Sequence, residues 1–228
     1  MSVAIAVMTK TPGFSPVKTR LASAVGTPYA VEVHRYSARA TASVVAEAAR
    51  RDDVTAYWAV AEAAPAAAAA WPAADVAAFE LIHQSGGGLG ERMGRLHSEL
   101  IARHGAALLV GTDSPQMEAA QLCRACDWLA ADTPRLVLGP ADDGGFWLFG
   151  GNRSIPLRDW KRIPYSTQRT GAHFAAMIEP YGKGLELPSL SDVDVIEDLE
   201  PLLGSLCGLD QATPSQLALR HWLEEQAR

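Results

Sequence analysis

The sequence has few of the features that mark disulfide-rich or membrane proteins. Its 228 residues include only three cysteines, Cys123, Cys126 and Cys207. An odd number in so long a chain is not typical of a disulfide framework. No uninterrupted apolar run approaches the ~20 residues that a membrane-spanning helix needs. We therefore expect a protein without structural disulfides and without a membrane span.

Basic residues are also scarce. The chain has 20 lysines and arginines against 26 acidic residues, which gives a formal net charge of −6. A nucleic-acid-binding surface normally shows a basic stripe, so we expect no nucleic-acid partner. The apolar run 2–8 follows no basic region and precedes no small-residue cleavage site, so it is not typical of a signal peptide. These absences predict a cytoplasmic protein and leave the oligomeric state open.

The composition is that of a globular protein. Hydrophobic residues make up 48% of the chain and charged residues 20%, both near the globular average. A chain of this length can form one α/β domain or two small ones. We expect a single domain over residues 1–228.

Hydrophobic periodicity predicts alternating strands and helices. The expected strands are 2–9, 53–60, 79–83, 106–110, 135–138, 146–149 and 185–187. The expected helices are 28–50, 89–104, 116–131, 171–180, 196–206 and 214–226, with 61–78 as a surface helix or loop. This alternation predicts an α/β fold with a three-layer, mostly parallel, Rossmann-like sheet and helices on both faces. Ligands of such folds lie at the carboxyl ends of the strands.

A basic loop follows the first predicted strand. Lys10, Lys18 and Arg20 lie within one loop that also contains glycine and proline. Arg20 can hold a phosphate with two donors, and Lys18 supplies a point charge. A solvated surface loop is the alternative. The position after the first strand favours phosphate binding.

Two acidic segments are candidates for a metal site. Asp113 follows an apolar strand, where a carboxylate can hold Mg²⁺ or Mn²⁺ against phosphate oxygens, and it or Ser114 can also cap the next helix. A second acidic segment, 191–198, contributes Asp192 and Asp194, and the Asp194–Glu197 spacing also fits a helix-capping box. Together they offer two carboxylates from separate loops. Whether Asp192 or Asp194 is the second ligand stays open.

Two glycine-containing segments complete the set of candidates. The segment 84–93 lets a flat group such as a base approach the backbone, although a flexible loop explains its glycines equally well. The segment 142–146 predicts a tight turn with room for a ligand, or an ordinary turn. The residues concerned are Gln84, Gly86, Gly87, Asp142, Asp143, Gly144 and Gly145.

Cys123 and Cys126 form a lone CxxC pair inside a predicted helix, which favours core packing over a zinc or redox site.

Six motifs occur along the chain in the same order as in one bacterial group of proteins. They are residues 17–21, 89–93, 111–115, 139–146, 165–167 and 192–198. Over roughly residues 2–205 the chain resembles GT-A-fold transferases of the rSAM/selenodomain-associated or arsenosugar-biosynthesis glycosyltransferase type, within the nucleotide-diphospho-sugar transferase superfamily. The loop 18–21 also resembles that of 2-phospholactate guanylyltransferases.

The resemblance implies a nucleotide-binding sheet and a divalent metal, Mg²⁺ or Mn²⁺. Lys18 and Arg20 match the phosphate loop, and Asp113 and Asp194 match the two metal carboxylates. With them we expect Lys18, Arg20 and Asp113 as catalytic residues. Lys10, Lys18, Arg20, Gln84, Gly86 and Gly87 are expected to bind the nucleotide, and Asp142, Asp143, Gly144, Gly145, Ser166 and Thr167 the acceptor.

The expected function is a metal-dependent transferase that takes a nucleotide or nucleotide-sugar and a small-molecule acceptor. Glycosyl transfer from an NDP-sugar is the first hypothesis, because the resembled family is named for glycosyltransferases. Nucleotidyl transfer from an NTP to a phosphorylated acceptor is the alternative, because the basic loop suits a pyrophosphate leaving group. A non-catalytic nucleotide-binding module is a third hypothesis, which the pair Asp113 and Asp194 disfavours. The base, the sugar and the acceptor stay open.

Overall fold

A seven-stranded sheet forms the centre of the molecule. The structure, a computed structural model, describes residues 2–63 and 65–226. The strands are β1 (Ser2–Thr9), β2 (Val54–Val60), β3 (Glu80–His83), β4 (Gly105–Val110), β5 (Arg135–Pro140), β6 (Phe146–Gly151) and β7 (Lys183–Glu186). Their order is β3-β2-β1-β4-β6-β5-β7. All neighbours pair in parallel except β6, which runs antiparallel to β4 and β5.

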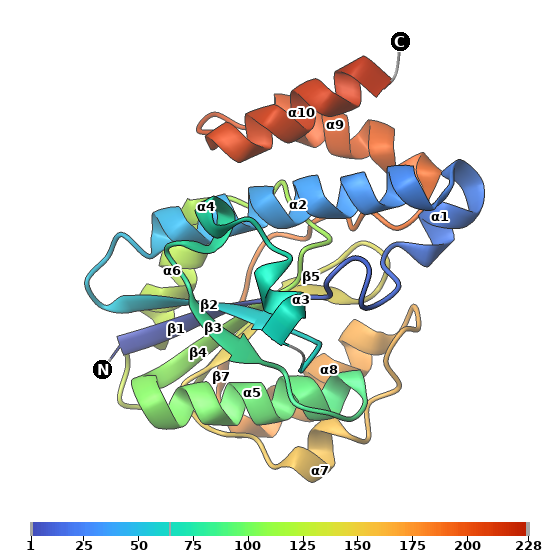
Figure 1. Cartoon of the computed structure of the whole chain (residues 1–228). Helices are drawn as coiled ribbons and strands as arrows, with labels where there is room; N and C mark the ends of the chain where they lie inside the picture. The colour runs from blue at the N-terminus through green and yellow to red at the C-terminus, as the bar shows by residue number, and fades with distance from the viewer. Residues whose placement is uncertain (1, 64, 227–228) are drawn as a thin grey trace.

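The helices cover both faces of the sheet (Figure 1). They are α1 (Thr19–Val25), α2 (Thr27–Ala48), α3 (Pro65–Ala69), α4 (Ala73–Val76), α5 (Leu89–His104), α6 (Ala119–Leu129), α7 (Leu157–Trp160), α8 (Thr170–Ile178), α9 (Leu199–Cys207) and α10 (Pro214–Gln226), with short 3₁₀ turns η1 (Glu179–Tyr181) and η2 (Ile196–Asp198). Buried residues of α2 and α6 share one core cluster, and those of α5, α7 and α8 share the other. The sheet is therefore buried on both faces, as the apolar runs of its strands require.

The strand β1 shows how the sequence separates the two layers. Val3, Ile5 and Val7 pack in the cluster on the α2 side, while Ala4 and Ala6 pack in the cluster on the α5 side. Alternate residues of a strand point to opposite faces. The small alanines face α5, and the branched residues fill the layer under α2.

The last two helices form an additional layer. Leu206 of α9 and Leu219 and Leu223 of α10 pack against Val33 and Ala40 of α2. Figure 1 shows α9 and α10 on the outer side of α2, away from the sheet. The long helix α2 is therefore covered on both sides, which agrees with its buried small residues.

The predicted α/β fold is confirmed, with a few local differences. The predicted loop 10–20 ends inside a helix that we did not predict, since α1 begins at Thr19, and α7 lies in the segment 152–166, for which we predicted no helix or strand. Cys126 is buried in α6, and this burial raises the pKa of its thiol to about 12, whereas Cys123 is half-buried. No helix within the described residues is both long and apolar enough to cross a membrane.

Candidate active site

A cleft of about 1010 Å³ lies at the carboxyl edge of the central strands. The ends of β1 and β4 contribute its floor, because parallel strands bring their carboxyl ends to one edge. The predicted site residues that line it are Lys10, Lys18, Arg20, Gln84, Asp113, Asp143, Gly145, Ser166, Thr167 and Asp194, together with Asp192. Gly86, Gly87, Asp142 and Gly144 are not among the residues that line it.

Lys18 joins the two acidic segments. Its backbone has left-handed dihedral angles at the start of α1 (φ 45°), and its side chain is only 2% exposed. The ammonium contacts Asp113 and donates to the carbonyl of Val193, and its Nζ lies 3.8 Å from Oδ1 of Asp194. One lysine therefore brings both predicted metal carboxylates into one small region.

Arg20 lies beside the same pair but nearer the solvent. Its side chain is 66% exposed, and its guanidinium donates to Asp194. Lys18 and Arg20 thus each have an aspartate partner. An incoming phosphate would compete with these carboxylates for the same donors.

Burial and the lysine charge act in opposite directions on the aspartates. Burial acts to raise the pKa of Asp113, but the charge and hydrogen bond of Lys18 hold that pKa below its ordinary value. Burial raises the pKa of Asp194 despite the nearby Lys18. Burial also raises the pKa of Asp192 to about 7, although the Ser114 hydroxyl donates to its carboxylate. Asp113 is therefore the carboxylate best held in its charged form.

Two helix-capping interpretations of these segments are wrong. Ser114 does not cap the next helix, because α6 begins only at Ala119 and the Ser114 hydroxyl bonds to Asp192. The predicted Asp194–Glu197 box is replaced by a different contact: Asp198 accepts the backbone N–H of Asp194 at 2.7 Å and of Val195 at 2.8 Å. The Asp194 side chain is therefore left to face the cleft.

The carboxylate oxygens of Asp113 and Asp194 fit a hard divalent cation that is also bound by a substrate. Within the described residues, no group of three or more His, Cys, Asp or Glu side chains is arranged to hold a metal alone. Asp113 and Asp194 already lie around one cation, the Lys18 ammonium. Mg²⁺ is commonly bound by one or two carboxylates plus substrate phosphates and water. The two aspartates fit that pattern.

Gln84 is buried at the cleft, and its side-chain amide bonds to other protein groups. Its amide nitrogen donates to the carbonyls of Thr9 (3.1 Å) and Ala59 (2.7 Å), and its oxygen accepts from Arg92 at 3.1 Å. The predicted contact between Gln84 and a nucleotide stays a prediction. Arg92, which was not among the predicted site residues, lies in the motif 89–93 and lines the cleft.

The predicted turn at 142–145 positions another wall of the cleft. Gly144 has φ +86°, and its carbonyl accepts the backbone N–H of Gly171 at 2.7 Å. Asp143 accepts the backbone N–H of Gly145 at 2.7 Å, and Asp142 accepts a hydrogen bond from Ser191 at 2.7 Å. Asp142 thus contacts protein, and its predicted acceptor contact stays a prediction. The turn fixes the segment that carries Ser166 and Thr167.

The loop after β1 is anchored from three sides. The Glu62 carboxylate accepts the backbone N–H of Thr11 at 3.1 Å, and the Trp71 indole donates to the Thr11 hydroxyl at 3.1 Å. His34 contacts the Lys10 carbonyl at 2.9 Å, and burial lowers the pKa of its ring. The start of the basic loop is therefore held by contacts to Glu62, Trp71 and His34, of which His34 also lines the cleft.

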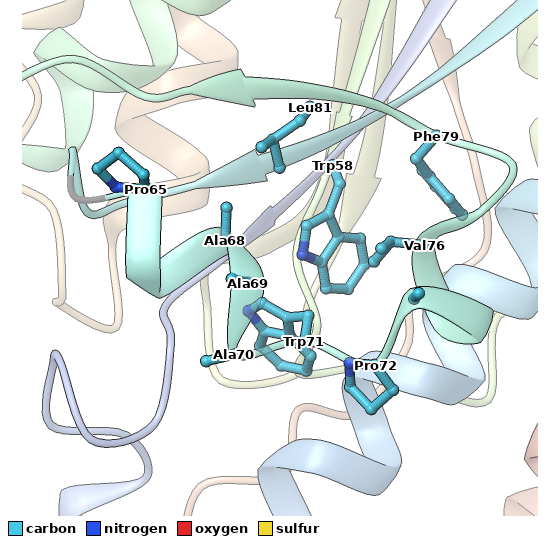
Figure 2. Close-up of a pocket in the computed structure, with 11 residues that line it drawn as sticks. Trp58, Pro65, Ala68, Ala69, Ala70, Trp71, Pro72, Val76, Phe79 and Leu81 are labelled. Carbon is cyan, nitrogen blue, oxygen red and sulfur yellow. The ribbon is translucent and has the colours of Figure 1, made fainter.

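A second hollow of about 640 Å³ lies near the edge of the sheet, beside β3 (Figure 2). Trp58 and Trp71 line it together with Val76, Phe79 and Leu81. Its lining residues include no charged side chain, so it offers nothing for phosphate chemistry.

The comparisons with known proteins agree with this geometry. A bacterial family model, "Uncharacterized protein conserved in bacteria (DUF2064)", matches residues 44–167, which is more than half of the chain. A candidate nucleotide-diphospho-sugar transferase from Desulfovibrio desulfuricans G20 matches with a TM-score of 0.79 at 23% identity, over 99% of this chain and 98% of that one. The sheet and its helices thus have the same fold as that structure. The chain belongs to the DUF2064 family.

More distant solved structures share the fold. A cytidylyltransferase from Leptospira borgpetersenii matches with a TM-score of 0.55 at 13% identity, over 100% of this chain and 95% of that one. Rv0371C from Mycobacterium tuberculosis H37Rv, in complex with manganese, matches with a TM-score of 0.50 at 19% identity, over 90% and 100%. No match is found among curated proteins.

Proposed function

We propose that the chain is a single-domain, cytoplasmic transferase that binds a nucleotide phosphate and a divalent metal ion in the cleft. One observation carries the proposal. The ammonium of Lys18 contacts Asp113 and lies 3.8 Å from Asp194, in a cleft at the carboxyl edge of a Rossmann-like sheet. A buried lysine, an adjacent arginine and two carboxylates are the groups that a phosphate and its bridging cation need.

Lys18 and Arg20 would hold the phosphate oxygens. Both have aspartate partners in the structure, and a phosphate offers more acceptor oxygens than either carboxylate. With these donors bound to the phosphate, the Asp113 and Asp194 carboxylates would be free to hold a divalent metal ion. A Mg²⁺ or Mn²⁺ ion held by these two aspartates would neutralise the negative charge that develops on the leaving phosphate group.

Support for the metal comes from the side chains and from one relative. Asp113 is held charged by Lys18, and a charged carboxylate is the form that ligates Mg²⁺ or Mn²⁺. Rv0371C, which shares the fold, is described as a complex with manganese. We propose Asp113 as the first ligand and Asp194 as the second, because Asp192 is engaged by Ser114.

Glycosyl transfer from an NDP-sugar is the leading reaction. The sequence motifs resemble glycosyltransferases, and the Desulfovibrio structure is named a candidate nucleotide-diphospho-sugar transferase. The acceptor would lie against Asp143, Gly145, Ser166 and Thr167, which line the cleft beyond the metal carboxylates.

Nucleotidyl transfer is the second candidate, and one feature favours it. Lys18 and Arg20 place two cations at the start of α1, which suits a triphosphate whose pyrophosphate departs. The Leptospira cytidylyltransferase shares the fold over the whole chain. The two reactions differ in the leaving group, which makes them separable by experiment.

The test combines a substrate panel with two substitutions. The purified chain is incubated with NTPs and NDP-sugars, a panel of sugar, alcohol and phosphorylated acceptors, and Mn²⁺ or Mg²⁺. Released pyrophosphate and released nucleoside diphosphate are measured separately. Asp113→Asn and Asp194→Asn keep the side-chain size but remove a charge, so each should reduce turnover at least about a hundredfold. Asp210→Asn, at an exposed position, is the matched control.

The same experiment can refute the proposal. Turnover that survives both aspartate substitutions, or that survives complete chelation of divalent ions, would exclude the proposed metal site. Release of pyrophosphate from an NTP would replace the leading reaction with the second one.

A further inference from the structure

Arg92 is a half-buried cation of the cleft to which the proposed chemistry gives no role, as it gives none to Lys10 in the loop after β1. It lies in the first turns of α5, on the face of the sheet opposite α1, which carries Arg20 (Figure 1). Both residues line the same cleft. Arg92 and Arg20 therefore enter the cleft from elements on opposite faces of the sheet.

The guanidinium of Arg92 has no acidic partner among the described residues. Lys18 and Arg20 each contact an aspartate, but no ion pair involves Arg92 over residues 2–63 and 65–226. Its Nε is buried and has no hydrogen-bond partner in the part of the chain that the structure describes. A half-buried charge without a counter-charge is unfavourable, and a ligand anion would compensate it.

Gln84 fixes the direction of this guanidinium. Both hydrogen bonds of the Gln84 amide nitrogen go to main-chain carbonyls, those of Thr9 and Ala59. The amide oxygen must therefore point the other way, where it accepts from Nη1 of Arg92 at 3.1 Å. Because Gln84 is buried and neutral, it orients Arg92 without neutralising it. It is a positioning residue for Arg92.

We infer that Arg92, oriented by Gln84, binds an oxyanion of the substrate, a phosphate or a carboxylate, that is additional to the phosphate oxygens at Lys18 and Arg20. Guanidinium is a donor-only group whose planar fork matches both anions. A neutral base edge would accept its hydrogen bonds but leave its charge uncompensated. The inference rests on the proposed function, because it takes the ligand to be a substrate of the nucleotide-dependent transfer.

The oxyanion can come from two sources, which binding measurements separate. In the first arm, pyrophosphate and the four common NTPs are titrated into the wild-type chain and into Arg92→Gln with Mg²⁺ present. In the second arm, phosphoglycolate, which carries a phosphate and a carboxylate, is titrated into each protein saturated with the nucleotide that binds best. In a third arm, the uncharged nucleosides are titrated. Melting temperatures establish that each variant is folded.

Arg92→Gln should weaken binding about ten- to a hundredfold in the arm that supplies the oxyanion and leave the nucleosides unaffected. Arg92→Lys, which keeps the charge and loses the fork, should recover part of the loss. Arg103→Gln, at an exposed ion pair with Glu99 on the same helix, is the control that should change neither arm.

Several results would overturn the inference. One is a loss of nucleoside binding in Arg92→Gln as large as its loss of nucleotide binding, since Arg92 would then contact the base or the sugar. Another is unchanged binding in the first two arms, which would leave the proposed function intact. Binding of pyrophosphate that depends on Arg92, with no nucleotide bound by the wild type, would support the oxyanion site and refute the proposed function. No binding of any phosphate compound by the wild type would overturn both.

Discussion

At the residue scale, Lys18 at the cap of α1 and Arg20 in the first turn of α1 have different structural roles. The Lys18 side chain is 2% exposed and bonds to Asp113 and to the Val193 carbonyl, whereas Arg20 is 66% exposed. The sequence presents both as phosphate-binding residues and gives no sign of this difference, because burial depends on how the loop packs against the segment 192–194.

The difference predicts separate effects on stability and on binding. Lys18→Met should lower the free energy of unfolding by about 1–3 kcal/mol, because it leaves the Val193 carbonyl and the Asp113 carboxylate without their donor. Arg20→Ala should lower nucleotide affinity but leave unfolding nearly unchanged, since exposed ion pairs contribute little. Urea denaturation of both variants, beside nucleotide titrations, makes the comparison. Equal losses of stability in the two variants would show that Lys18 is not the structural bridge between the two segments.

His97 gives a second residue-scale prediction, which concerns pH. The ring is fully buried in α5 against Phe149 and Trp160, neither nitrogen has a hydrogen-bond partner among the described residues, and burial lowers its pKa to about 3. The unfolded chain binds a proton at the ordinary value near 6.5 and the folded chain does not. Stability from this residue is therefore complete above about pH 6.5 and declines as the pH falls toward about 3.

The size of this effect can be measured with one variant. Lowering the pH from 7 to 4.5 should remove about 2–3 kcal/mol of unfolding free energy through His97. His97→Leu should lower that pH dependence by the same amount, whatever it does to stability at pH 7. Denaturant titrations at the two pH values provide the measurement. A variant with the wild-type pH slope would mean that the ring is protonated inside the folded protein.

The sequence predicted which residues meet at the site better than it predicted what they contact. Asp113 and Asp194 were expected at one place because they are carboxylates from separate loops that match the two metal carboxylates of the resembled family, and Lys18 lies near both. The role of Gln84 as a support for Arg92 was not predictable, because it depends on two backbone carbonyls from β1 and β2. Local sequence carries no information on such long-range partners.

At the element scale, strands and long helices were predictable and short elements were not. The strand β1 matches its predicted range, because an uninterrupted apolar run of that length is typical of a buried parallel strand. The seven-residue α1 was missed, since its cap is a lysine in the left-handed region and not a residue that usually caps helices. The late start of α6 was missed because Ser114 is taken by a side chain distant in sequence, Asp192.

The turn at 142–145 supports an element-scale prediction. Gly144 has φ +86°, and an added Cβ would lie 2.0 Å from the Gln168 carbonyl oxygen. Gly144→Ala should therefore destabilise the fold by at least about 2 kcal/mol and increase amide exchange over residues 165–171. Gly86→Ala is the control, since a Cβ there meets nothing within 4 Å. Equal melting temperatures for the two variants would show that the turn does not hold this wall of the cleft.

At the scale of the whole molecule, the C-terminal helices reach the loop that carries Asp113. Gln216 of α10 is buried and donates to the carbonyls of Pro115 and Met117, each at 2.9 Å. The backbone N–H of Val193 in turn donates to the Asp113 carbonyl at 2.9 Å. A helix on the outer layer thus supports the two segments that form the proposed metal site, although it contributes no residue to the cleft.

This connection predicts an effect on the site from outside it. Gln216→Leu leaves two buried carbonyls unpaired and should cost about 2 kcal/mol or more of stability. Leu219→Ala, in the fully buried part of the same helix, should cost about 2–5 kcal/mol by leaving a cavity. Only Gln216→Leu acts on the loop 113–117, so only it should weaken Mn²⁺ binding in the presence of nucleotide. Calorimetric titrations well below both melting temperatures would compare them. If Leu219→Ala weakens Mn²⁺ binding as much as Gln216→Leu does, the site responds to general loss of stability and not to this hydrogen-bonded connection.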